Sequence, residues 1–107
     1  MIIYNITANI DDSIHDDWLE WIQQQIPKVL ATGFFIKATF TKVLVEESIG
    51  GLTYSIQYLA PSKAALEAYY QQHAAHFQAE ETQRFADKML AFRTELEWID
   101  EFTLTPH

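Results

Sequence analysis

Residues 2–10 read Ile2-Ile3-Tyr4-Asn5-Ile6-Thr7-Ala8-Asn9-Ile10, and this stretch decides the fold. Apolar side chains occupy the even positions, and polar ones occupy the odd positions from Asn5 onward. A period of two predicts a strand with one buried face. Asp11-Asp12-Ser13 follows with turn formers and a helix N-cap, and His15-Asp16-Asp17 places acids where they complement the helix dipole. The chain therefore begins with a strand that leads directly into a helix.

The predicted first helix starts near Ile14. It carries an apolar stripe at helical spacing, and this stripe should pack on the sheet. The stripe consists of Ile14, Trp18, Trp21, Ile22 and Gln25-Ile26. Proline disfavours helical geometry in the residue before it, so Pro27 predicts a break and a short second helical piece that ends at Thr32-Gly33.

Two further strands form a predicted hairpin. Residues 34–40 alternate, and the apolar phase then switches at Val43 and Val45, which indicates a bulge near Thr41-Lys42. Residues 46–51 are a polar connection that ends in two glycines. Residues 52–60 alternate again, so the second and third strands lie side by side.

The rest of the chain predicts a helix and a last strand. Ser62 caps a helical region that runs to Phe85, with a kink near the segment His73–His76. From Leu90 to Trp98 the residues alternate, and they form the fourth strand. The order β-α-β-β-α-β predicts the α+β fold class. We expect one ferredoxin-like domain over residues 1–107, with a four-stranded antiparallel sheet in the order 4-1-3-2 and two helical segments on one face.

Composition excludes several kinds of partner. The 107 residues are 49% hydrophobic and 21% charged, as in an ordered protein with one core. A net charge of −8 and scattered lysines and arginines argue against nucleic acid and membrane surfaces. We see no export or membrane-spanning segment. The chain has no cysteine, so we expect a cytoplasmic protein without thiolate chemistry. No motif predicts a cofactor.

One face of the predicted sheet is left without helices. It is polar but rich in threonine and neutral residues, so either water covers it or the same face of a second subunit does. The sequence leaves both alternatives open. The candidates for an interface on this face are Asn5, Thr7, Thr39, Ser55, Gln57, Arg93 and Glu95.

Several segments resemble a known bacterial family. They are Met1 to Thr7, Asp16 to Trp21, Ala31 to Phe34, Thr53 to Tyr58, Phe85 to Lys88 and Ala91 to Thr94. Together they are similar to the domain of unknown function 4286 family over nearly the whole chain. The resemblance implies a dimeric α/β-barrel, in which two sheets pack face to face, and it implies a homodimer. It implies no activity.

Aromatic side chains should converge between the sheet and the helices. Such clusters are normally core, and some dimeric α/β-barrel proteins open the same space as a pocket for aromatic ligands. The pocket candidates are Tyr4, Trp18, Tyr58, His73 and His76. His73, His76 and Glu80 have a spacing that metal ligands use. Because no supporting motif accompanies them, we expect no metal site. His15 and His107 are expected at the surface.

Two functions follow from these expectations. The first is a homodimeric small-ligand-binding or structural module without an assigned activity. The alternative is a small oxidoreductase, similar to a monooxygenase, that acts on an aromatic, quinone or haem ligand. Whether the protein is an enzyme, and which small molecule it binds, stay open at this point.

Overall fold

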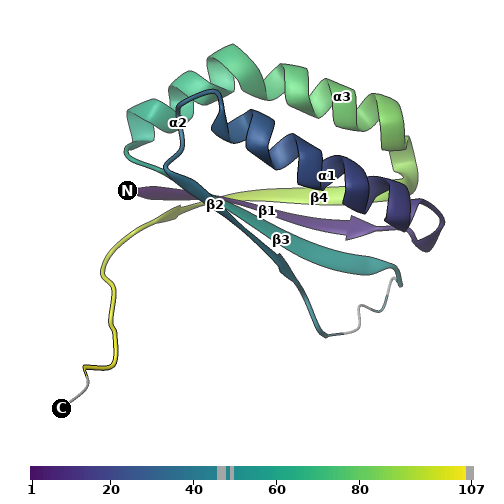
Figure 1. Cartoon of the computed structure of the whole chain (residues 1–107), viewed down its shortest axis with the longest axis horizontal. Coiled ribbons are helices and arrows are strands. Elements are labelled where there is room, and N and C mark those ends of the chain that lie inside the picture. Colours follow the sequence, from purple (N-terminus) through teal and green to yellow (C-terminus); the bar gives the residue numbers. More distant parts are fainter. Residues whose placement is uncertain (46–47, 49, 106–107) are drawn as a thin grey trace.

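A computed structural model describes residues 1–45, 48 and 50–105. Four strands form one antiparallel sheet in the order β2-β3-β1-β4, which is the predicted order. Figure 1 shows the helices together on one face of this sheet. The elements are β1 (Ile2–Ile10), a 3₁₀ turn (Asp12–Ile14), α1 (His15–Leu30), β2 (Lys37–Lys42), β3 (Leu52–Ala60), α2 (Lys63–Tyr69), a π-helical turn (Tyr70–Ala74), α3 (Ala75–Phe85), a second 3₁₀ turn (Ala86–Lys88) and β4 (Met89–Glu97).

The central strand β1 pairs with β3 on one side and with β4 on the other. Its even positions face the helices, and Tyr4, Ala8 and Ile10 are buried there. Partners directly opposite in a sheet share a face, so β3 adds its own even positions to the core. The most deeply buried large side chains are Trp18, Ile10, Ile56 and Leu66. The predicted period of two therefore holds through both central strands.

α1 runs without a break through Pro27, so the predicted interruption is wrong. Its buried face continues from Trp18 to Val29 across the proline, and packing on both sides holds the helix together. The carbonyl of Gln23 loses its usual backbone donor at Pro27. Because Gln23 is exposed, water can bond to that carbonyl.

β2 and β3 keep one register from Lys37 to Lys42, so the predicted bulge is also wrong. The backbone N–H of Val43 still bonds to Thr53 at 2.8 Å, and Val45 is exposed. The phase switch in the sequence marks the end of the strand, where the chain leaves the core. Part of the predicted 46–51 connection lies outside the described residues, and so does His107.

The second helical region contains the predicted irregularity, but three residues earlier than expected. A π-helical turn, Tyr70–Ala74, joins α2 to α3 without ending the helix. Ser62 caps α2 as predicted, since its hydroxyl accepts from the backbone N–H of Ala65 at 3.0 Å. Single π-helical turns inside α-helices are frequent at functional sites.

The open face of the sheet is the one that no helix covers. By register it carries Asn5, Thr7, Thr39, Ser55 and Gln57, as predicted. It also carries apolar residues of β4, although the predicted placement of Arg93 and Glu95 on this face implies that the apolar residues of β4 face the helices. These are Leu90, Phe92 and Leu96, which lie opposite Asn9, Thr7 and Ile3.

Arg93 and Glu95 were wrongly placed on the open face. They lie opposite Ile6 and Tyr4, and so they point toward the helices. From Phe92 to Glu97 the polar Arg93, Glu95 and Glu97 occupy the helix face and the apolar Phe92 and Leu96 the open face, which reverses the pattern of β1 and β3. Met89 and Ala91, at the start of β4, still face the helices. An edge strand that is covered only at one end by α3 tolerates this reversal, because its helix-facing side chains can reach solvent.

Gly51 provides a test of the turn after β2. Its φ of +71° favours glycine, and an added Cβ would lie 2.6 Å from the carbonyl oxygen of Ile10. We expect Gly51→Ala to lower the free energy of unfolding by about 2 kcal/mol, since strain and a clash with backbone act together. Gly33→Ala is the control, because Gly33 has a φ of +86° and open space around it. Its loss should be about 1 kcal/mol. If urea unfolding showed equal losses of stability for Gly51→Ala and Gly33→Ala, the clash with the Ile10 carbonyl would contribute nothing.

Candidate functional site

A cavity lies between the sheet, α1 and α3. It has about 40 Å³ of space for water, room for a few water molecules. Most of its lining is apolar or aromatic, with a few polar groups at one side. The lining residues are Tyr4, Ile6, Ala8, Trp18, Trp21, Ile22, Gln25, Val29, Ile56, Tyr58, Tyr69, Phe77, Gln78, Glu81 and Arg93. Mostly apolar walls with few polar groups are typical of small-molecule sites.

Three tyrosine rings form one wall of the cavity. The ring of Tyr4 lies 6.3 Å from that of Tyr58 and 6.2 Å from that of Tyr69, centroid to centroid. Burial raises the pKa of all three phenols above the ordinary tyrosine value. They therefore stay protonated at neutral pH, and each keeps a hydroxyl that can donate a hydrogen bond.

α1 supplies the opposite wall. Trp18 and Gln25 are seven residues apart, or about two helical turns, so both side chains lie on the buried face. Gln25 is only 3% exposed and Trp18 is fully buried. Among the described residues, neither the indole Nε1 of Trp18 nor the amide Nε2 of Gln25 has a hydrogen-bond partner. Trp21 differs, because its indole N–H donates to Glu80 at 3.3 Å.

Glu81 of α3 and Arg93 of β4 form the polar side of the cavity. The guanidinium Nη2 of Arg93 lies 3.6 Å from Oε1 of Glu81, and both side chains are partly buried. Burial raises the pKa of the Glu81 carboxyl, and the nearby Arg93 offsets this only in part. The site therefore holds a carboxylate in a place that disfavours its charge.

The same two side chains lead to the surface. Together with Gln78 they also line a shallow hollow of about 180 Å³ beside the cavity, between α3 and β4. The Glu81–Arg93 pair therefore stands between the inner cavity and solvent.

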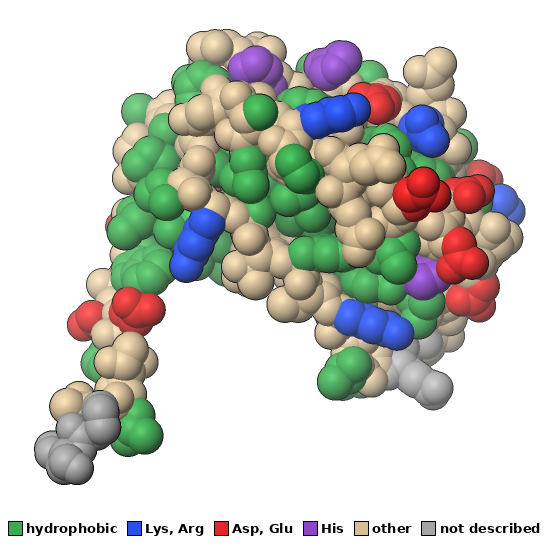
Figure 2. Space-filling view, in the orientation of Figure 1, with side chains coloured by type: hydrophobic (Ala, Val, Ile, Leu, Met, Phe, Trp, Pro, Cys, Tyr) green, Lys and Arg blue, Asp and Glu red, His purple; other side chains and the backbone are tan. Residues whose placement is uncertain are grey.

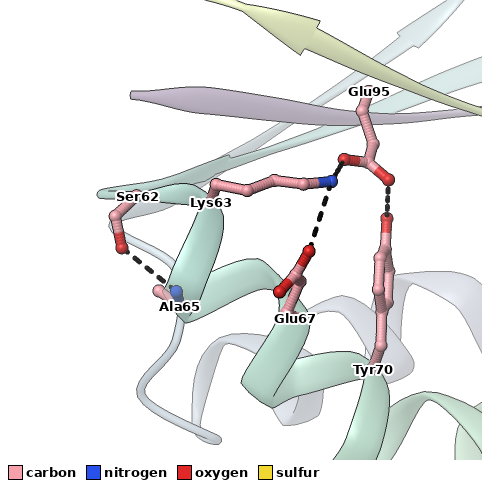
Figure 3. A network of polar contacts seen from close by, with 6 residues as sticks. All are labelled: Ser62, Lys63, Ala65, Glu67, Tyr70 and Glu95. Carbon is pink, nitrogen blue, oxygen red and sulfur yellow. Dashed lines mark hydrogen bonds and ion pairs between the residues drawn. The ribbon is translucent and has the colours of Figure 1, made fainter.

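Glu95 belongs to a separate network at the edge of the sheet, drawn in Figure 3. Its carboxylate accepts from the Lys63 ammonium and, at 3.1 Å, from the hydroxyl of Tyr70. Lys63 also lies 3.9 Å from Glu67. The hydrogen bond from Lys63 lowers the pKa of Glu95. The network ties the start of α2 and the π-helical turn to β4, and it is largely exposed.

His73 and His76 are not among the residues that line this cavity. His73 is half-buried, with its ring 5.7 Å from Phe34 and 6.2 Å from Tyr69, and His76 is exposed. Among the described residues, no group of three or more His, Asp or Glu side chains could hold a metal ion. Tyr69 separates His73 from the cavity because the histidine lies one turn farther along the helix.

His15 is half-buried, which corrects its expected place at the surface. Its Nε2 lies 2.6 Å from the hydroxyl of Tyr54, and its Nδ1 lies 3.3 Å from Asp16. Neither His15 nor Tyr54 is among the residues that line the cavity. The contact fixes the start of α1 on β3.

The pocket candidates Tyr4, Trp18 and Tyr58 do lie around the cavity. Sequence reasoning missed Gln25, Glu81 and Arg93 as their neighbours. Gln25 did carry a signal, because it is a polar residue in the apolar stripe of the first helix. Glu81 and Arg93 gave none, since only the register of β4 brings them together.

Residues 1–99 match the family described as Domain of unknown function (DUF4286). The chain belongs to this family. The expected resemblance is therefore confirmed, and the family comes without an assigned activity. No curated protein matches the sequence.

Two solved structures share the fold. One is a dimeric ferredoxin-like protein from an uncultured marine organism, with a TM-score of 0.69, 14% identity, and coverage of 94% of this chain and 97% of that one. The other is At3g17210 from Arabidopsis thaliana, with a TM-score of 0.65, 20% identity, and coverage of 94% and 100%. Together they confirm the ferredoxin-like fold. No helix in the described part of the chain is long and apolar enough to cross a membrane.

The buried carboxyl of Glu81 predicts a pH effect on stability. A raised pKa in the folded state means that folding favours the neutral acid, so stability falls as pH rises from the ordinary glutamate pKa through the raised one. We expect Glu81→Gln to raise the free energy of unfolding at neutral pH by about 1 kcal/mol. The gain should vanish below the ordinary glutamate pKa.

Urea unfolding across pH checks this expectation. Glu20→Gln, at an exposed position of α1, is the control and should change stability little at any pH. A Glu81→Gln variant that is less stable than the wild type at neutral pH would show that the ion pair outweighs the burial.

Proposed function

We propose that the protein is a homodimeric module, joined through the open faces of its two sheets, that holds a small ligand in the cavity of each subunit. The main support for the dimer is the apolar surface that β4 presents on the open face. Leu90, Phe92 and Leu96 are 54%, 64% and 41% exposed there. Leu90 and Phe92 are neighbours on this face, and Leu96 follows after Thr94. Exposed apolar side chains of this size on one strand favour a protein contact over water.

The polar residues of the open face support the same proposal because they already bond to one another. The amide of Asn5 donates to Thr7 at 3.2 Å and accepts from Ser55 at 2.8 Å. Asn9 donates to Thr53 at 3.1 Å. When a second subunit covers such a face, few polar groups lose their hydrogen-bond partners, so the desolvation penalty is small.

The chain after β4 also favours a second copy as the occupant. It leaves on the side of the open face and stands clear of the body (Figures 1 and 2). Trp98 stays attached, since its N–H donates to the carbonyl of Met1 at 2.9 Å. Beyond it Ile99, Phe102 and Leu104 are 84–95% exposed. In a dimer joined at the open faces, this arm would reach the partner and bury these side chains.

Similarity of fold adds support for the dimer, because the marine protein is itself described as dimeric.

The cavity supports the ligand-binding part of the proposal. Its lining offers hydroxyl, amide, guanidinium and carboxylate groups, but neither His73 nor His76. We therefore favour binding over the oxidation of an aromatic ligand.

A charge at Phe92 tests the dimer. Phe92→Arg would bring one arginine from each subunit into the interface, so we expect the dissociation constant of the dimer to rise at least about 100-fold. Light scattering across a dilution series measures the effect. Gln23→Arg, at an exposed position of α1, is the matched control and should stay dimeric. Thermal melts by circular dichroism should show both variants folded. A Phe92→Arg variant that remains as dimeric as the control would exclude this interface.

A further inference from the structure

The arm after β4, residues 98–105, carries negative charge as well as apolar surface. Asp100 and Glu101 are both exposed, and the arm contains no lysine or arginine. The match to the family ends at residue 99, so these two acids lie beyond it. Within the described part of the chain, neither acid forms an ion pair. Both carboxylates are therefore available to a cation on a second subunit.

A matching surface lies at the start of β2. Of the basic residues in the four strands, only Lys37 lies on the open face, where it is opposite Leu59 of β3. Lys37 is exposed, and the residue before it, Ile36, is 59% exposed. In the described residues Lys37 has no ion-pair partner. The start of β2 thus offers one apolar and one cationic side chain.

Two sheets that pack face to face with aligned strands can obey two-fold symmetry in two ways. An axis that runs along the strands exchanges the two edges of the sheet, so β4 lies against β2 of the partner. An axis that crosses the strands brings β4 against the reversed β4 of the partner. The two arrangements take the arm to different places on the second subunit.

The axis along the strands takes the arm to the start of the partner's β2. Leu96, Ile3, Leu59 and Lys37 form one row across the sheet. This axis keeps each row at its level, so Leu96 and the arm that follows it lie beside the partner's Lys37. The acids of the arm then meet a cation.

The axis across the strands takes the arm to the start of the partner's β4 instead. A hollow of about 190 Å³ lies there, and its charged lining residues are Asp11, Asp87 and Lys88. Two carboxylates against one ammonium would repel the acidic arm. Charge complementarity therefore favours the axis along the strands.

The arm turns its charge toward the side that a second subunit would cover. Trp98 and Glu101 line a hollow of about 250 Å³ between the arm and the open face. Lys37 of the same chain lines this hollow as well. An experiment must therefore separate a contact between subunits from a contact within one chain.

We propose that the acidic arm of each subunit docks at the start of β2 in the other subunit. Ile99 packs there against the partner's Ile36, and Asp100 and Glu101 lie beside the partner's Lys37. By symmetry the contact occurs twice in each dimer. This inference rests on the open-face dimer of the proposed function and is independent of the ligand.

Two charge reversals test the contact in mixed dimers. Lys37→Glu and Glu101→Lys each place like charges together in their own homodimers. A heterodimer of the two variants has one native contact and one reversed contact, and both attract. With one chain ¹⁵N-labelled, native mass spectrometry resolves the three dimers after mixing in equal amounts. The heterodimer should outnumber the two homodimers together by about fourfold, since every contact changes from repulsion to attraction.

Lys42→Glu and Glu20→Lys are the control mixture. They carry the same changes of net charge at exposed positions, one on the helix side of β2 and one on α1. Their heterodimers should about equal their homodimers in number, which is the statistical ratio. If the arm paired with its own chain, the test mixture would also give this ratio, because each variant would repel itself in every dimer.

Cross-linking checks the direction of the axis in a chain that has no cysteine of its own. Thr39 and Thr94 share a row at opposite edges of one sheet, about 14 Å apart. A short bis-maleimide should link position 39 to position 94 between chains of a Thr39→Cys/Thr94→Cys variant. A Leu90→Cys/Leu96→Cys variant should give no link between these two positions. Mass spectrometry of the linked peptides identifies each pair.

Two results would overturn the inference while the dimer stands. One is a statistical ratio in the test mixture, and the other is a link between positions 90 and 96 of different chains. A wild-type protein that stayed monomeric under the same conditions would remove the dimer of the proposed function together with this contact.

Discussion

The pairing of β1 with both β3 and β4 is the constraint on which the rest of this structure depends. Because side chains alternate along a strand, the register of β1 assigns every residue of its neighbours to a face. Tyr4, Ala8 and Ile10 then face the helices, and Asn5 and Thr7 face away. A shift of one residue would exchange the aromatic core for the asparagine and threonine ladder. The burial of Trp18, a residue of α1, against the sheet opposes such a shift, since its ring packs 5.2 Å from that of Tyr54 on β3.

β4 obeys this register with the opposite chemistry, and both proposed functions follow from that reversal. Its polar Arg93 points inward and meets Glu81, which gives the core a polar side with access to solvent. Its apolar Leu90 and Phe92 point outward and give the open face an apolar surface. The inner consequence is a cavity with polar groups at its entrance. The outer consequence is an apolar surface along β4, beside the polar residues of the open face, that no helix covers.

The sequence predicted the parts of this fold that depend on local periodicity. The order of elements, the strand order and the inward face of β1 all follow from alternation and from turn residues. The predictions from the sequence were wrong where tertiary contacts determine the local structure. The packing of Val29 carries α1 through Pro27, and the faces of β4 depend on a register with β1 that alternation alone does not fix. Tyr4, Trp18 and Tyr58 could be predicted around a cavity because they belong to apolar stripes. The pair of Glu81 and Arg93 could not, because its two residues come from different elements.

The mass of the unmodified protein in solution shows directly whether the open face of the sheet is a subunit interface. Light scattering over a wide range of concentrations measures it directly. One chain has a mass of 12.4 kDa, so we expect a stable species of twice that mass. A mass of one chain at every concentration would leave Leu90, Phe92 and Leu96 in water and would show that the open face is not a subunit interface.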